Sequence, residues 1–238
     1  MISNILAIVA TFSILSVNSL PLSENQTSTQ GMSIFGHTLT SPLPGLAMPK
    51  TPLAEHQFSL ENRYDNAYVN DVFKDNILLN IAYLGGRVKS YDQINWDEVK
   101  KPFEYKFTLE PGQTFAYHDG VLDKYQGKVV KTTGAHFNAQ EGFKSSGYLY
   151  GDGVCHLASL IYWTAKDAGL EVEAPTNHDF MKINEIPREY GVSIYAAPGQ
   201  TDSEARQNLY VTNNRQNPVT FVFDHENNSL KLSAIEES

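Results

Sequence analysis

Residues 151–160 read GDGVCHLASL and contain Cys155, the only cysteine in the 238-residue chain. Two glycines flank an aspartate. From Val154 to Ala168 apolar residues then recur with the spacing of a half-buried helix, and Gly169 is a typical helix stop. This pattern predicts Cys155 in a first helical turn, where free backbone N–H groups and the helix dipole favour an anion. We expect a lowered thiol pKa and a nucleophilic thiolate; the alternative is a small buried core residue.

The composition is that of an acidic chain with enough apolar residues to build a core. The formal net charge is −9, and 41% of the residues are hydrophobic. No run of Lys and Arg occurs anywhere, so the basic footprint of a nucleic-acid-binding protein is absent. We therefore expect no nucleic-acid partner, and electrostatic binding to an anionic membrane surface is disfavoured for the same reason.

Residues 1–19 have the pattern of a secretory signal peptide. An apolar run from Ile5 to Val17 is followed by small residues up to Ser19. An uncleaved membrane anchor is one alternative, because the uncharged stretch to Ser23 reaches the roughly 20 residues needed to span a bilayer; a buried strand is another. We expect an extracytoplasmic protein, secreted or anchored at the cell envelope. A lone exported cysteine forms no internal disulfide, so it is expected to be buried, paired with another chain, or functional.

The rest of the chain divides into three expected parts. Residues 20–56 are rich in Ser, Thr, Pro and Gly and predict a flexible linker. Residues 57–102 predict a short strand and an accessory helix from Asp65 to about Leu84. Residues 103–235 predict one compact α+β domain, in which the cysteine-bearing helix packs on antiparallel β strands.

Short segments rich in β-forming residues predict the strands of this domain. The expected strands are residues 104–109, 114–115, 171–174, 192–195, 209–211, 219–223 and 230–232. Paired asparagines at 213–214 and 227–228 predict turns between the last of them.

A cysteine acyl-transfer site also needs a base, a group that orients the base, and donors for an oxyanion. His178 is the best placed of the seven histidines, because the chain has room to fold back across the helix start. An ordinary surface histidine is the alternative. Asp179 or Asn177 could orient the ring, and the backbone N–H groups of Cys155 and His156 could receive the oxyanion.

Two further helix residues could line a pocket, since Ser159 lies one turn from Cys155 and Tyr162 lies two turns away. Ordinary core packing is their alternative. His156 is expected on a different face, because helical neighbours point about 100° apart. A zinc site of Cys155, His156 and His178 is disfavoured, because adjacent Cys and His lack the usual ligand spacing and no second cysteine exists. We predict no metal and no cofactor.

This motif and its surroundings resemble the VanW family of bacterial cell-envelope proteins. The family sequence Gly-Gly-Gly-Val-Cys-Gln, followed by a Ser/Thr-rich pair and Leu-Tyr-Asn-Ala, is similar to residues 151–162. Residues 168–170 match a later Ala-Gly-Leu, and His178 stands where the family histidine is expected. The resemblance covers residues 103–235.

Three residues depart from the family pattern while the cysteine and the histidine remain. Asp152 replaces the middle glycine, His156 replaces the glutamine, and Asp179 replaces a serine. The replacement of the glutamine by His156 puts any role of its amide in doubt.

The resemblance implies cysteine-dependent acyl transfer on peptidoglycan stem peptides, of the L,D-transpeptidase type. Cys155 would attack a peptide carbonyl, and His178 would take the thiol proton. The residues expected to support the site or bind substrate are Gly151, Gly153, His156, Ser159, Tyr162 and Asp179. The alternatives are a cysteine amidase or peptidase of the cell wall, and a non-catalytic envelope-binding module. The expected partner is peptidoglycan or another envelope polymer, with N-terminal membrane association as an option.

Overall fold

The computed structural model describes residues 51–147, 151–196 and 201–237. The expected signal peptide or anchor, and most of the expected linker, lie outside these ranges. Within them, none of the helices combines the length and the apolar character needed to cross a bilayer.

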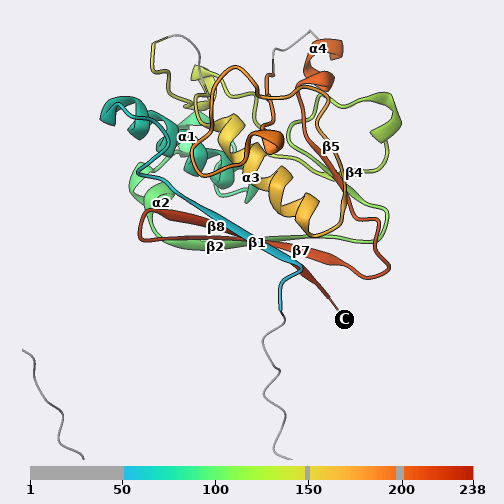
Figure 1. The fold of residues 1–238 in the computed structure, drawn as a ribbon. Helices are drawn as coiled ribbons and strands as arrows, with labels where there is room; N and C mark the ends of the chain where they lie inside the picture. The colour runs from blue at the N-terminus through green and yellow to red at the C-terminus, as the bar shows by residue number, and fades with distance from the viewer. Residues whose placement is uncertain (1–50, 148–150, 197–200, 238) are drawn as a thin grey trace, which may run out of the picture. The chain divides into compact units, whose positions relative to one another are not determined.

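Four antiparallel strands form the first sheet, in the order β1-β8-β7-β2 (Figure 1). The strands are β1 (Ala54–Ser59), β2 (Phe103–Leu109), β7 (Val219–Glu226) and β8 (Ser229–Glu236). Asn227 and Asn228 join β7 to β8 and both have positive φ, of 51° and 56°. A two-residue hairpin turn needs this backbone conformation, and asparagine tolerates it better than most residues.

Four shorter strands form the second sheet, in the order β4-β3-β6-β5. They are β3 (Thr114–Ala116), β4 (Val129–Lys131), β5 (Glu171–Glu173) and β6 (Tyr210–Thr212). The β3–β4 pair is parallel, and β6 pairs antiparallel with both β3 and β5.

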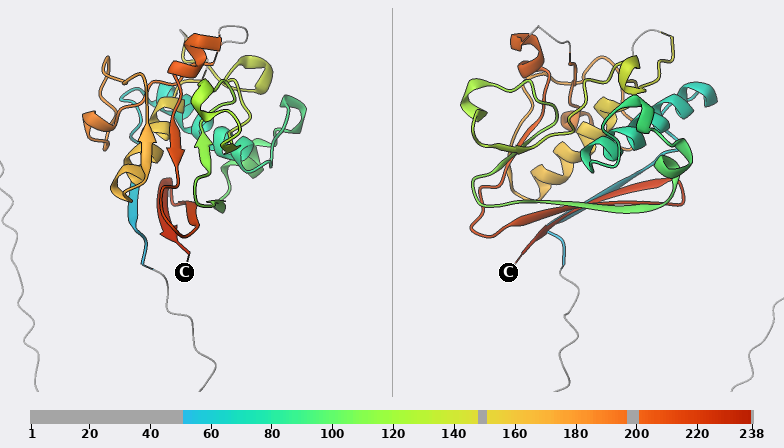
Figure 2. Two further views of the ribbon diagram at one scale, coloured as in Figure 1. Left: turned by 90° about the vertical axis from the view of Figure 1, so that its right-hand side faces the viewer. Right: turned by 180° about the vertical axis from the view of Figure 1, so that it is seen from behind.

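Two long helices lie on one face of the first sheet (Figures 1 and 2). Helix α1 (Ala67–Leu84) begins at Asn66, whose side chain accepts a hydrogen bond from Val69 N, and helix α3 (Val154–Asp167) carries Cys155. Helix α3 packs against α1 and against β1 and β8. The shorter helices are α2 (Trp96–Lys100) and α4 (Thr201–Arg206). The architecture is therefore the expected α+β fold.

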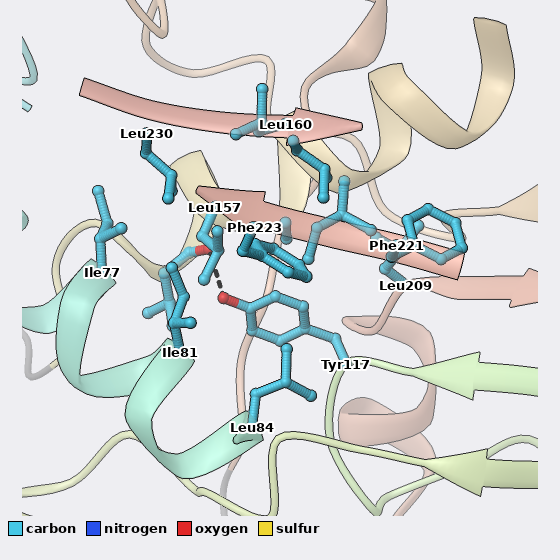
Figure 3. Close-up of a cluster of buried hydrophobic side chains, with 14 of the residues drawn as sticks. Ile77, Ile81, Leu84, Tyr117, Leu157, Leu160, Leu209, Phe221, Phe223 and Leu230 are labelled. Atoms are coloured by element: carbon cyan, nitrogen blue, oxygen red, sulfur yellow. Dashed lines mark hydrogen bonds between the residues drawn. The ribbon is translucent and has the colours of Figure 1, made fainter. Parts of the chain in front are cut away.

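The hydrophobic core lies between these two helices and the first sheet. Figure 3 shows side chains of α1, α3, β7 and β8 meeting there, including Ile77, Ile81, Leu157, Leu160, Phe221, Phe223 and Leu230. All seven are almost completely inaccessible to solvent. Burying each such side chain stabilises the fold by about 1.5–3 kcal/mol. This burial holds both helices against the first sheet.

The structure corrects two expectations about elements. Strand β1 begins at Ala54, so the expected linker boundary at residue 56 falls inside a strand that pairs with β8. Residues 192–195 do not form the expected strand: a single bridge joins Val192 to Asn177. This segment is instead held against helix α3 by side chains of the candidate site.

Candidate active site

The turn before Cys155 depends on two glycines with positive φ, of 82° at Gly151 and 99° at Gly153. A Cβ atom on Gly151 would lie 2.8 Å from the Cβ atom of Phe137. On Gly153 it would lie 2.7 Å from the carbonyl oxygen of Phe73. Both positions therefore exclude a side chain, and the start of α3 sits directly against the backbone of α1.

Asn76 on α1 fixes the turn through its buried side chain. Its Nδ2 donates to the carbonyl oxygens of Asp152, at 2.8 Å, and Lys144, at 3.0 Å. Its Oδ1 accepts from Lys144 N at 2.8 Å. The Asp152 carboxylate in turn accepts from Ser146 N at 2.8 Å. Asp152, where the resembling family has glycine, thus ties the turn to the preceding loop.

Cys155 is the second residue of α3, as expected, and its side chain is half-buried. Burial raises the pKa of the thiol to about 11, and the nearby Asp152 carboxylate raises the pKa further, while N–H groups of Ile194 and Cys155 itself oppose the shift. The expectation of a lowered pKa is therefore wrong. Desolvation of the thiolate outweighs the hydrogen-bond donors at the helix start.

The segment around Ile194 covers the sulfur. Ile194 N lies 3.4 Å from Cys155 Sγ, and the thiol is 3.7 Å from the carbonyl oxygen of the same residue. Ser159 fastens this segment to the helix, because its Oγ donates to Cys155 O at 2.7 Å and accepts from Val192 N at 2.9 Å. Ser159 therefore acts as a positioning residue for the Ile194 backbone.

His178 is buried and held in one orientation. Its Nδ1 lies 3.1 Å from the carbonyl oxygen of Met181, and its backbone N–H donates to Gly191 O at 3.1 Å. Burial lowers the pKa of the imidazole. Because a carbonyl only accepts, Nδ1 carries the proton and the neutral ring has its lone pair on Nε2. Among the described residues, no hydrogen bond joins this ring to Cys155.

His156 lies beside His178. The two rings are nearly perpendicular, with centroids 6.4 Å apart, and His156 also meets the edge of Phe73 at 4.9 Å. Burial lowers the pKa of His156 well below its usual range, and the Arg63 guanidinium lowers it further. His156 is therefore a neutral, buried residue that packs between Phe73 of α1 and His178.

Two other expected residues stand at the margin of the site. Tyr162 packs its ring against Tyr190, with centroids 6.0 Å apart. Asp179 is exposed, and its carbonyl oxygen accepts from Arg188. The hydrogen-bond partner that orients His178 is the Met181 carbonyl, although the Asp179 charge does raise the imidazole pKa.

Of the two expected oxyanion donors, one is already engaged. His156 N donates to Gly153 O at 3.0 Å. The N–H group of Cys155 helps to lower the pKa of its own thiol. The donor that contacts the sulfur is the N–H group of Ile194, 3.4 Å away.

Sequence reasoning missed four residues that shape this site: Phe73, Asn76, Tyr117 and Ile194. Tyr117 is fully buried, and its hydroxyl donates to Val154 O at 3.0 Å, so it supports the start of α3 from the core (Figure 3). A structural role for Asn76 could have been inferred from the sequence, because an asparagine on the apolar side of a helix requires hydrogen-bond partners there.

The described residues contain no group of three or more His, Cys, Asp or Glu side chains placed to hold a metal ion. Cys155, His156 and His178 therefore do not form such a group.

The fold and the site define an α+β domain with a single cysteine at a glycine-shaped helix start. The chain belongs to the VanW-like family: the family model described as "VanW like protein" matches residues 105–235, more than half of the chain. The family is linked to vancomycin resistance and the cell wall. No curated protein and no solved structure matches the chain.

Proposed function

We propose that this protein is an extracytoplasmic cysteine acyltransferase that acts on peptidoglycan stem peptides, of the L,D-transpeptidase type. The observation that carries the proposal is the Cys155 thiol at the start of α3, with the backbone N–H group of Ile194 3.4 Å from its sulfur. Donors beside a nucleophile are suited to the oxyanion that forms when the sulfur adds to a carbonyl. Membership of a family linked to the cell wall supports the choice of substrate.

The protonation states of the two reacting side chains suit a base-assisted attack. With a thiol pKa of about 11, Cys155 is protonated at neutral pH. His178 is neutral there because burial lowers its pKa, and its Nε2 lone pair is available as a base. We expect substrate binding to bring Nε2 and Sγ within hydrogen-bond reach, since catalytic contacts commonly tighten only in the complex.

The reaction then proceeds in two balanced steps. Cys155 Sγ bonds to a stem-peptide carbonyl carbon while His178 takes the thiol proton, the C–N bond breaks, and the leaving amine receives that proton. The amine of an acceptor stem next attacks the thioester. A new C–N bond forms, the C–S bond breaks, and the proton lost by the acceptor amine returns to the thiol through His178.

Mass analysis of products from a purified soluble muropeptide tests this proposal. The parent protein should give a crosslinked dimer, Cys155→Ala should give none, and His178→Ala should be slowed by roughly 100-fold or more. The control is His225→Ala, which removes a buried histidine of β7 that hydrogen-bonds Lys101 O and lies outside the site. Dimer formation by Cys155→Ala would overturn the proposal, and a shortened monomer alone would indicate an amidase or peptidase.

Two observations favour a second candidate, a non-catalytic envelope-binding module. The thiol pKa is raised, and no imidazole hydrogen-bonds the sulfur within the described ranges. A structural thiol would resist iodoacetamide at neutral pH even in the presence of muropeptide. Unlabelled Cys155, no product, and unchanged binding of Cys155→Ala to isolated cell wall would together favour this module.

A further inference from the structure

A cavity of about 640 Å³ lies beside the cysteine turn, between α1, the end of α2 and the loop that precedes the turn. This volume is within the range of small-molecule sites. Its lining includes Tyr68, Asp71, Lys74, Asp75, Lys100 and Lys144.

A buried carboxylate organises the charges of this cavity. Asp75 is almost fully buried, and its two oxygens contact different lysines: Oδ1 is 2.8 Å from Lys100 Nζ, and Oδ2 is 2.5 Å from Lys144 Nζ. Both ammonium groups also lie over the Trp96 ring, 5.6 Å and 4.2 Å from its centroid. One ammonium neutralises the carboxylate, so the pair presents a second positive charge that is held in place.

The cavity is therefore cationic in an acidic protein. Its lining includes three lysines and two aspartates, whereas the whole chain has a net charge of −9. The side chains of Lys100 and Lys144 are 44% and 41% exposed, so both ammonium groups can reach a ligand. At the rim, Tyr68 is 66% exposed and offers an aromatic surface.

The cationic wall and the cysteine turn form one hydrogen-bonded unit. The Asn76 side chain binds the backbone of Lys144 at both N and O, and it also binds Asp152 O. Cys155 follows Asp152 by only three residues. A ligand that contacts Lys144 is thus held on the scaffold that positions the nucleophile.

We propose that this cavity binds a free carboxylate of the peptide substrate. This inference rests on the acyl-transfer function proposed above, and it assigns the cavity as the subsite that docks the stem peptide. The stem chain would lie from the lysine pair towards the cysteine turn, with its carboxylate on the solvent-exposed side of the two ammonium groups. Charge-assisted contacts of this kind give both orientation and affinity.

Calorimetric titration of a soluble muropeptide into the full chain carrying Cys155→Ala tests this subsite without catalysis. Two probes are compared, one with free stem carboxylates and one with those carboxylates amidated. We expect the free-carboxylate probe to bind about 10-fold more tightly, with an advantage that shrinks as salt screens the lysines.

Lysine variants locate the contact within the protein. Lys144→Met and Lys100→Met each leave Asp75 with one ammonium partner, and each should weaken binding of the free-carboxylate probe about 10-fold with little effect on the amidated probe. Lys128→Met removes an exposed lysine outside the cavity and should change neither.

Each result decides between the subsite and the reaction. Equal affinity for the two probes would overturn the subsite even if a lysine variant fails to fold, and so would unchanged binding in two folded lysine variants. Carboxylate-dependent binding without dimer formation by the parent protein would support the subsite and overturn the transferase proposal. Dimer formation without carboxylate-dependent binding would support the transferase and overturn the subsite.

Discussion

Opposing influences on one sulfur atom set the ionisation of Cys155. Burial raises the thiol pKa to about 11, the N–H group of Ile194 lowers it, and the Asp152 carboxylate raises it. Burial is the largest of these influences, and the charge of Asp152, three residues before the cysteine, adds to it. A protonated thiol is less easily oxidised than a thiolate, because reactivity follows thiolate content.

Removing the Asp152 charge should make Cys155 more reactive. Asp152→Asn keeps an oxygen acceptor for Ser146 N but lacks the negative charge that raises the thiol pKa. The thiolate fraction should therefore increase at any pH below the parent pKa of about 11. We expect iodoacetamide labelling at pH 8 to accelerate roughly threefold or more. Asp97→Asn on α2 is the control, and an equal or slower rate in Asp152→Asn would contradict the assignment.

Replacement by alanine should destabilise the protein much more at Gly153 than at Gly112, which has open space around it. Gly153→Ala combines a φ of 99° with a Cβ atom 2.7 Å from Phe73 O. Gly112 has a φ of 79°, but a Cβ there would meet no atom within 4 Å. Urea unfolding should show a loss of about 1–2 kcal/mol for Gly112→Ala, from backbone strain alone, and about 3 kcal/mol or more for Gly153→Ala. Equal losses of stability in the two variants would mean that the close contact of a Cβ atom at position 153 with Phe73 does not destabilise the protein.

At the scale of elements, helix α1 is a support for the cysteine turn as well as part of the core. Asn76 supplies three hydrogen bonds to the turn and its preceding loop. Asn80, one turn further along α1, is equally buried, and neither of its side-chain polar atoms has a hydrogen-bond partner. Two asparagines of one helix thus offer a matched comparison.

Asn76→Leu should destabilise the protein by about 2–4 kcal/mol, because partly buried backbone groups of Lys144 and Asp152 lose their partners. Asn80→Leu should be neutral or stabilising by about 1 kcal/mol, because it removes unpaired polar atoms. Urea unfolding measures both changes. The assignment fails if Asn80→Leu is the more destabilising substitution.

Elements with a strong local pattern were predictable from the sequence. Helices α1 and α3 follow from apolar periodicity and from glycine stops, and the β7–β8 hairpin follows from alternation around Asn227 and Asn228. Residues 192–195 carried a strand-like pattern but lie along α3, because Ser159 and the Cys155 sulfur take their backbone N–H groups. The raised thiol pKa was unpredictable for the same reason, since this segment buries the sulfur.

At the scale of the whole molecule, strand pairing joins distant parts of the chain. Ala54 of β1 lies opposite Ala234 of β8, and α3 packs against β1. Residues before the family match at 105–235 therefore complete both the first sheet and the support of the cysteine helix. No local pattern in residues 57–102 indicates this partnership, because pairing over such a separation depends on the assembled core.

The family-matching part should not fold without the residues that precede it. A fragment of residues 103–238 lacks β1 and α1, and with them fully buried side chains that include Phe58, Leu60, Ile77, Leu78 and Ile81. Each contributes about 1.5–3 kcal/mol, so their combined loss is comparable with a typical total stability of about 5–15 kcal/mol.

Circular dichroism during heating should show a cooperative transition for a fragment of residues 51–238 and none for residues 103–238. The longer fragment is the control, because it keeps every described element of the sheets and helices. Mixing the shorter fragment with a peptide of residues 51–102 should restore some ordered structure if the missing contacts are the cause. Cooperative melting of residues 103–238 alone would show instead that this part forms a stable domain without β1 and α1.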